Sequence, residues 1–167
     1  MKRQTIDRIL LGTSIGGFAI LSISFMLMPY EELGILPGIL FWGGLLLGVV
    51  LQIVLENRRG ALFAQYNVKR ETMQKAKNGL LSVCSNRLAT VADGILAADA
   101  IATVLAFVFT RGTGYLCYVC LSVLVFSFCM HCILNGRIYI FVKNQDKVRQ
   151  MLEQKKANTM EKGEGKK

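Results

Sequence analysis

Four long apolar segments alternate with polar stretches along the chain. The first two cover residues 9–28 and 35–55 and contain no charged side chain, and the third and fourth cover about 90–110 and 115–137. A helix needs about 20 apolar residues to cross a hydrocarbon core roughly 30 Å thick, because only a helical backbone satisfies its own hydrogen bonds there. The pattern therefore predicts an all-α integral membrane protein with four transmembrane helices.

The inner ends of the third and fourth segments are less sharply marked. The third begins between Ala89 and Gly94, and the fourth ends at Leu134, or at Val142 if the helix passes through Asn135 and Gly136. A short polar turn centred near Gly112 makes these two helices antiparallel neighbours.

Basic residues indicate the orientation of the four helices. Eighteen of the 20 lysines and arginines lie in three polar stretches, at 1–8, 56–88 and 143–167. The short loops at 29–34 and 110–114 hold only Arg111 among basic residues. Because retained basic segments mark the inner side, both termini are expected in the cytoplasm of a multi-pass plasma-membrane protein. The apolar run at 9–28 is too long for a signal peptide and should remain uncleaved.

The chain divides into a transmembrane domain, 1–142, and a basic, largely disordered cytoplasmic tail, 143–167. The inner loop at 56–88 is long and basic, with near-helical spacing of apolar residues, so part of it should continue the second span or lie on the inner leaflet. It is either a plain connector or a docking surface for a partner. Anionic lipid headgroups would attract the basic side chains of this face.

Composition agrees with this assignment. Hydrophobic residues make up 53% of the 167 positions and charged residues 19%, and the mean hydropathy is +0.42. A soluble domain is excluded by these values. The net charge of +9 does not indicate nucleic-acid binding, because the basic residues flank membrane spans and show no binding motif.

Glycines in the first two spans predict close helix packing. Gly12 and Gly16 form one GxxxG motif, and Gly44 and Gly48 form another. Such motifs let two backbones approach closely where lipid gives no hydrophobic drive for association. They serve either packing within the chain or the interface of a homo-oligomer or larger complex.

Ionisable residues in the last two spans are the candidate polar site. The third and fourth helices are antiparallel and joined by a turn near Gly112, so residues equally far from that turn lie at the same depth in the membrane. The numbers of two such residues sum to about 225 to 230. This pairs Asp99 with His131, and Asp93 with Arg137 near the inner headgroups. The Asp99–His131 pair is either a structural hydrogen bond or part of a proton relay in a small proton-coupled carrier. One partly polar face of the fourth span would point at protein: Cys117, Cys120, Leu124, Ser127, Phe128, His131 and Asn135.

Cysteines offer a second, redox interpretation. Cys117 and Cys120 form a C-x-x-C motif at the start of the fourth helix, where the helix dipole lowers a thiol pKa. In this motif and in helix number the chain resembles the membrane thiol oxidoreductases of the vitamin K epoxide reductase type. The resemblance implies a redox pair at Cys117 and Cys120, but that family's second cysteine pair has no counterpart in residues 29–34.

No catalytic or metal-binding signature is complete, and no cofactor is expected. Cys129 and Cys132 point away from His131 on a helix, whereas tetrahedral zinc requires converging ligands. The sequence therefore favours a non-enzymatic accessory or assembly subunit of a transporter or membrane complex. The membrane thiol redox protein and the proton-coupled carrier are the alternatives.

Overall fold

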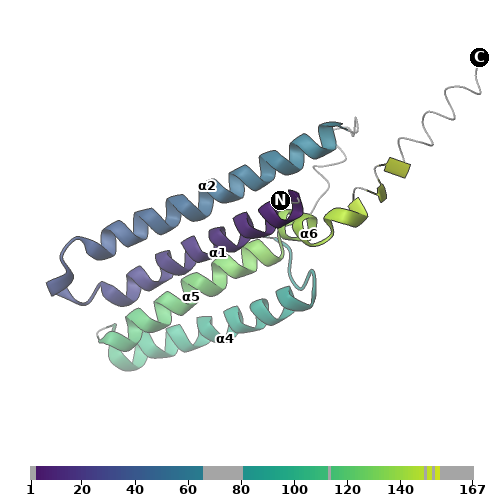
Figure 1. The fold of residues 1–167 in the computed structure, drawn as a ribbon. Coiled ribbons are helices and arrows are strands. Elements are labelled where there is room, and N and C mark those ends of the chain that lie inside the picture. The colour runs from purple at the N-terminus through teal and green to yellow at the C-terminus, as the bar shows by residue number, and fades with distance from the viewer. Residues whose placement is uncertain (1–2, 66–80, 113, 149, 152, 155–167) are drawn as a thin grey trace, which may run out of the picture.

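The computed structural model describes residues 3–65, 81–112, 114–148, 150–151 and 153–154. Throughout this part of the chain the regular elements are helices (Figure 1). Four of them are long and apolar enough to cross a membrane: α1 (Arg3–Leu27), α2 (Leu36–Gln65), α4 (Arg87–Thr110) and α5 (Tyr115–Leu134). The predicted all-helical fold with four candidate membrane-spanning helices is therefore confirmed.

Local sequence signals set the ends of these helices. A short 3-10 helix, η1 (Glu31–Leu33), and Gly34 with a φ of 52° join α1 to α2. The side chain of Asn86 accepts a hydrogen bond from the backbone N–H of Ala89 and caps the first turn of α4. Arg111, Gly112 and Gly114 have positive φ angles and reverse the chain between α4 and α5.

Helix α2 is longer than the apolar segment at 35–55. It continues to Gln65, as expected for the start of the inner loop. Residues 66–80, the core of that loop, and the end of the basic tail at 155–167 lie outside the described residues.

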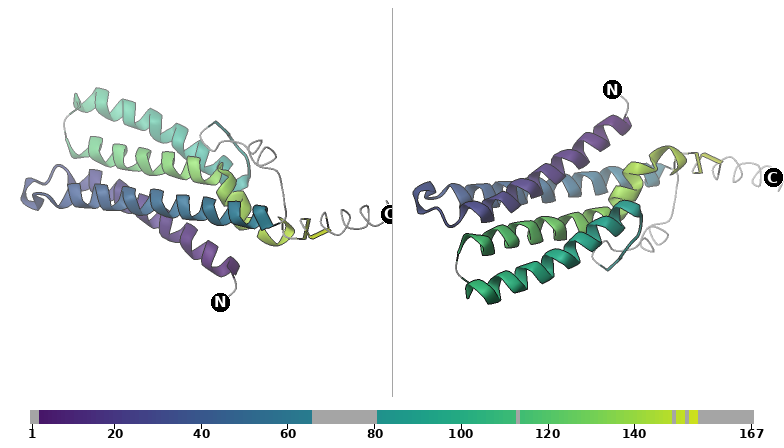
Figure 2. Two further views of the ribbon diagram at one scale, coloured as in Figure 1. Left: turned by 90° about the horizontal axis from the view of Figure 1, so that it is seen from above. Right: turned by 90° about the horizontal axis from the view of Figure 1, so that it is seen from below.

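The four long helices form an open row rather than a closed bundle (Figures 1 and 2). In space their order is α2, α1, α5, α4: α1 packs on α2 and on α5, and α5 packs on α4. Among the described elements, α4 therefore has extensive contacts with α5 alone.

Glycines allow α1 and α2 to pack with their backbones in contact. A Cβ added at Gly44 would lie 2.5 Å from the backbone nitrogen of Leu21 and 2.6 Å from the carbonyl oxygen of Gly17. A Cβ at Gly17 would lie 2.8 Å from the backbone nitrogen of Gly48. By contrast, a Cβ at Gly12 or Gly16 would meet nothing within 4 Å. The second GxxxG motif thus packs within the chain, whereas the first lies on an open face.

Serines connect α1 to both of its neighbours. The Ser14 hydroxyl donates to the carbonyl of Gly48 on α2 at 3.0 Å. Ser22 on α1 and Ser122 on α5 each donate to the other's carbonyl oxygen, at 2.5 and 2.7 Å. Small hydroxyl side chains let the helices stay close while their hydroxyl groups are satisfied, which suits an interface in lipid.

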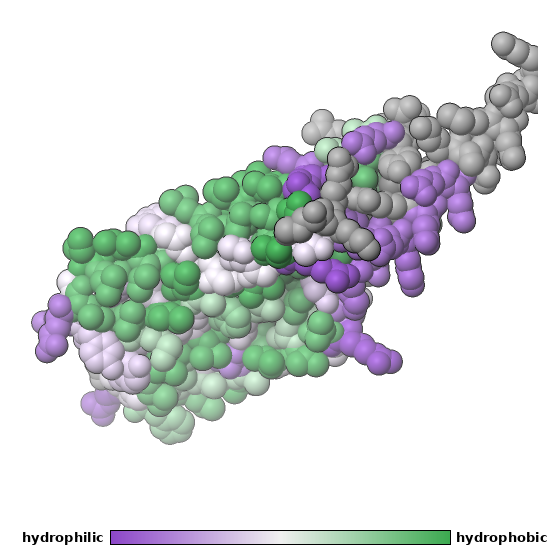
Figure 3. Space-filling model, in the orientation of Figure 1, coloured by the Kyte–Doolittle hydropathy of each residue, from purple (hydrophilic) through white to green (hydrophobic). Residues whose placement is uncertain are grey.

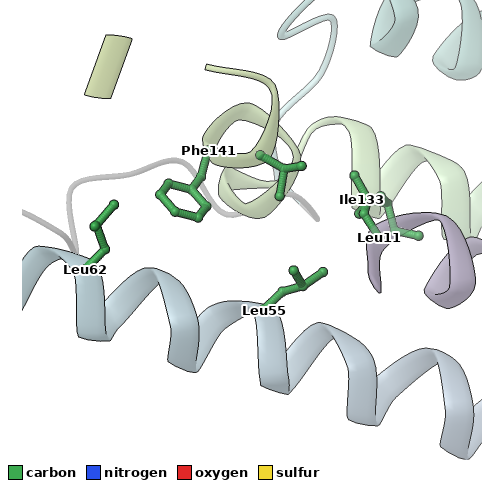
Figure 4. Packing of buried hydrophobic residues seen from close by; sticks show 6 residues of the cluster. Leu11, Leu55, Leu62, Ile133 and Phe141 are labelled. Atoms are coloured by element: carbon green, nitrogen blue, oxygen red, sulfur yellow. The ribbon is translucent and has the colours of Figure 1, made fainter. Parts of the chain in front are cut away.

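The main apolar core lies where a short helix, α6 (Arg137–Lys143), folds across the ends of α1, α2 and α5 (Figure 4). The buried side chains of this core are Leu11, Leu55, Leu62, Ile133, Phe141 and Val142. Gly136 permits the sharp turn into α6, because a Cβ there would lie 2.8 Å from the carbonyl oxygen of Cys132. The α5 helix therefore ends at Leu134, and the alternative of one helix running to Val142 is wrong.

The surface separates into an apolar body and a polar end (Figure 3). Exposed apolar side chains cover the long helices, as on Ile39, Trp42, Leu46, Val50 and Ile53 of α2. Charged residues of the first turns of α1, the last turns of α2, and α6 gather at the same end of the row. This distribution suits helices surrounded by lipid along most of their length.

Replacing Gly44 by alanine tests the backbone contact between α1 and α2. The new methyl group would overlap the backbone of α1, so we expect Gly44→Ala to lower stability by about 1–3 kcal/mol or more. The matched control is Gly43→Ala, where the added carbon meets nothing within 4 Å. Thermal unfolding in detergent, followed by circular dichroism, measures both variants. Equal melting temperatures for the two would show that this close contact does not exist.

Candidate functional site: a polar seam between α4 and α5

Polar side chains follow the interface between α4 and α5 from one end to the other. We call this interface the seam, and define it by Asp93, Asp99, Thr103, Thr110, Cys117, Ser127, His131 and Asn135. Its α5 members come from the partly polar face that the sequence predicts to point at protein.

Asp93 is the centre of a closed hydrogen-bond cluster at the inner end of the seam. Its Oδ1 lies 2.6 Å from Nδ1 of His131 and accepts from the side-chain amide of Asn135 at 2.8 Å. Its Oδ2 accepts from the backbone N–H of Cys84 at 2.6 Å. Both carboxylate oxygens are thus occupied, and the Asp93 and His131 side chains are only 9% and 10% exposed.

The segment before α4 completes this cluster by turning back onto the end of α5. Cys84 has a φ of 53°, a left-handed conformation that aims its backbone N–H at Asp93. The next two residues bind α5: the Ser85 N–H donates to the side chain of Asn135 at 3.0 Å, and the Asn86 amide donates to the Leu134 carbonyl at 2.9 Å. The segment that leads into α4 is therefore held in place by hydrogen bonds to the last residues of α5.

The middle of the seam contains a second carboxylate with far fewer partners. The hydroxyl of Ser127 lies 2.5 Å from Oδ2 of Asp99 and also 2.8 Å from the carbonyl oxygen of Val123. A hydroxyl has one proton, so these two acceptors compete for it. Asp93 and Asp99 are both half-buried, but Asp93 has hydrogen-bond partners on both carboxylate oxygens and Asp99 on one.

The outer half of the seam holds hydroxyl and thiol groups. Thr103 donates to the carbonyl of Cys120 at 3.4 Å, and the Thr110 hydroxyl lies 2.8 Å from the sulfur of Cys117. Cys117 is buried and Cys120 half-buried, and neither forms a disulfide. Redox activity of this pair remains a prediction.

The predicted pairs of ionisable residues need correction. His131 binds Asp93 rather than Asp99, which lies six residues further along α4, about 9 Å of helix rise. The turn beside Gly112 is tight, with the Gly112 N–H bonded to the carbonyl of Phe107. Partners therefore lie equally far from this turn and have numbers that sum to about 225, the lower limit of the expected range.

Arg137 does not pair with Asp93 either, because the chain turns at Gly136 and carries it toward α2. There Arg137 donates to Glu56 Oε1 at 3.0 Å, and Arg59 donates to the same oxygen at 2.7 Å. Sequence reasoning assigned Glu56 no role. Its position as the first acid after a span, three residues before an arginine, is a weak signal for such a cluster.

A further cluster at the same end was also missed from the sequence. Asp7 on α1 is almost fully buried and accepts from Arg58 at 2.5 Å and from the Gln145 side chain at 2.7 Å. Gln4 donates to Asp146 close by. These bonds tie the start of α1 to α2 and to the segment that follows α6.

In the described part of the chain, no three histidine, cysteine or acidic side chains lie close enough together to hold a metal ion.

Comparison of the chain with models of known protein families, with curated proteins and with solved structures finds no match.

A double-mutant cycle tests the corrected pairing. His131→Ala or Asp93→Ala should each lower the free energy of unfolding by about 1–3 kcal/mol, because the remaining partner is left buried without its hydrogen bond. The double variant should lose less than the two single losses combined. Thermal unfolding in detergent gives all four stabilities.

The control cycle joins His131→Ala to Asp99→Ala, which the structure does not pair. Those two losses should add to within about 0.5 kcal/mol. Coupling of His131 to Asp99 but not to Asp93 would restore the original prediction and refute the register described above.

Proposed function

We propose that this chain is a non-enzymatic accessory or assembly subunit of a transporter or other membrane complex. The observation that carries the proposal is the open row of helices, in which α4 packs extensively on α5 alone among the described elements. An end helix of this kind offers most of its circumference to another membrane protein or to lipid.

Midway along the two helices, the exposed side chains of α2 and α4 differ in size. Exposed residues of α2 are mainly bulky there, including Trp42, Leu46 and Val50. The ends of α4 also expose bulky residues, but its middle exposes a set of small ones: Gly94, Ala97, Ala98, Ala100 and Ala102. Small residues are enriched where membrane helices touch, because they allow close backbone approach. This contrast supports lipid against α2 and protein against α4.

A second small-residue face on α1 supports the same role. Gly12 and Gly16 are exposed, and both have open space where a Cβ would stand. They lie between exposed Ile9 and Ile20 on the same side of the helix. Because glycine has no side chain, the backbone of a second helix can approach closely at Gly12 and Gly16.

The basic end of the row is proposed to face the cytoplasm of a plasma-membrane protein. Arg8, Arg87 and Lys143 are exposed there, and the opposite turn exposes Glu31 and Glu32. The positive-inside rule supports this orientation, with both termini inside and the basic end near anionic headgroups.

Site-specific photo-crosslinking in native membranes tests the assembly role. A photoreactive amino acid at Ala98 on α4 should give an adduct with another polypeptide, and one at Val50, which is 51% exposed on α2, should give lipid adducts only. Gel mobility and mass spectrometry identify the products. Lipid adducts alone at Ala98 and also at Gly16 would refute the assembly role.

Cysteine labelling tests the orientation. In a variant with all five native cysteines replaced by alanine, a membrane-impermeant reagent added to intact cells should label Glu32→Cys but not Lys143→Cys. Both positions are exposed, so accessibility within the protein is matched. Labelling of Lys143→Cys alone would place the basic end outside.

A further inference from the structure

Asp99 lies deep in a candidate membrane span. It is the thirteenth of the 24 residues of α4, about 18 Å along the helix from Arg87. A carboxylate at such depth is costly and is normally compensated by a partner. In the part of the chain that the structure describes, the hydrogen-bond partner of Asp99 is the hydroxyl of Ser127.

Comparison with the other enclosed carboxylates shows what Asp99 lacks. Asp93 and Asp7 both have hydrogen-bond donors on each of their two oxygens. For Asp99 the described part of the chain supplies one donor to Oδ2, shared with the Val123 carbonyl, and none to Oδ1. The charge of Asp99 is therefore the least compensated of the three.

The surroundings of Asp99 leave room for another helix. Beside it, Ala98 and Ala102 are small and exposed, and a Cβ at Gly94 one turn away would meet nothing within 4 Å. On the same flank, an apolar groove of about 260 Å³ runs between α4 and α5 and includes the Ser127 side chain in its wall. Val91, Ile95, Phe126 and Met130 line the rest of the groove.

The carboxylate of Asp99 indicates which kind of molecule would bind this face of α4. A lipid chain has no donor for the carboxylate. A second copy of this chain has no lysine or arginine at residues 9–57, 88–110 or 112–136, so it has none near the middle of a span. Its single histidine is buried against Asp93. A cation that pairs with Asp99 near mid-membrane would therefore come from a different polypeptide.

We propose that the Asp99 face of α4 binds a transmembrane helix of another protein that carries a lysine or arginine near mid-membrane. The cation pairs with Asp99, and apolar side chains beside it occupy the groove. This inference depends on the assembly role proposed above and names the chemistry of the partner. A charge-assisted hydrogen bond in a low-dielectric medium makes such a pair selective.

Peptide binding in vesicles tests the pairing with a defined probe. The full chain, labelled with a donor fluorophore, is reconstituted in phosphatidylcholine vesicles with acceptor-labelled transmembrane peptides of leucine and alanine. One peptide carries a central lysine and its matched control carries a central glutamine. We expect energy transfer to show at least about tenfold tighter association of the lysine peptide.

Two conservative variants make the result specific. Asp99→Asn keeps the size of the side chain and an acceptor for Ser127 but removes the charge, and should abolish the lysine preference. Glu32→Gln removes one negative charge from the exposed turn between α1 and α2, away from the seam, and should keep the preference. Equal binding of the two peptides to the unmodified chain, or a lysine preference that survives Asp99→Asn, would overturn the inference.

Crosslinking in native membranes separates this inference from the assembly role. The adduct at Ala98 should disappear in the Asp99→Asn variant, and the captured polypeptide should contain a basic residue within a membrane span. An Ala98 adduct that persists in Asp99→Asn would leave the assembly role standing and refute the cation pairing.

Discussion

For four helices long and apolar enough to span a membrane, the lack of water in a hydrocarbon core is the constraint on which the rest of the structure depends. Apolar side chains gain little there by leaving lipid for protein, so helices associate through close backbone approach and shared hydrogen bonds. Each interface between the long helices of this protein uses one or both of these two kinds of contact. Gly17, Gly44 and Gly48 bring α1 against α2, and Ser22 and Ser122 join α1 to α5. Carboxylate, imidazole and hydroxyl groups join α5 to α4.

These interfaces differ in how many of their polar groups have hydrogen-bond partners. The glycine contact is already tight, and the serine pair satisfies both hydroxyls. Asp93 has partners for both oxygens, whereas Asp99 has one shared donor. An unsatisfied charge is costly in lipid. The closed cluster at Asp93 holds α4 in place, whereas the open carboxylate of Asp99 is the group proposed to pair with another protein.

The polar end of the molecule follows different rules, because its charged side chains are paired near the surface rather than between apolar helices. Ion pairs there differ in exposure. Glu56 and Arg137 lie partly exposed, so their pair contributes more to geometry than to stability, whereas Arg59, which also binds Glu56, is buried. Together with the apolar core under α6, they connect α1, α2 and α5 at one end. The opposite end is joined by an edge-on contact between the rings of Tyr30 and Tyr115, whose centroids are 5.8 Å apart.

The amino-acid sequence by itself determined the four helical spans, because the bilayer thickness fixes their length and composition. It also predicted the polar face of α5 that meets α4, since the helical period gathers Ser127, His131 and Asn135 on one side. Phe128 of the predicted face is exposed, however, and Ser122 on another face contacts α1. Only the tertiary structure decided the partners. His131 binds Asp93 rather than Asp99 because the tight turn beside Gly112 sets the register between two helices. The order of the helices in the row was likewise decided by contacts between distant segments, which no local period encodes.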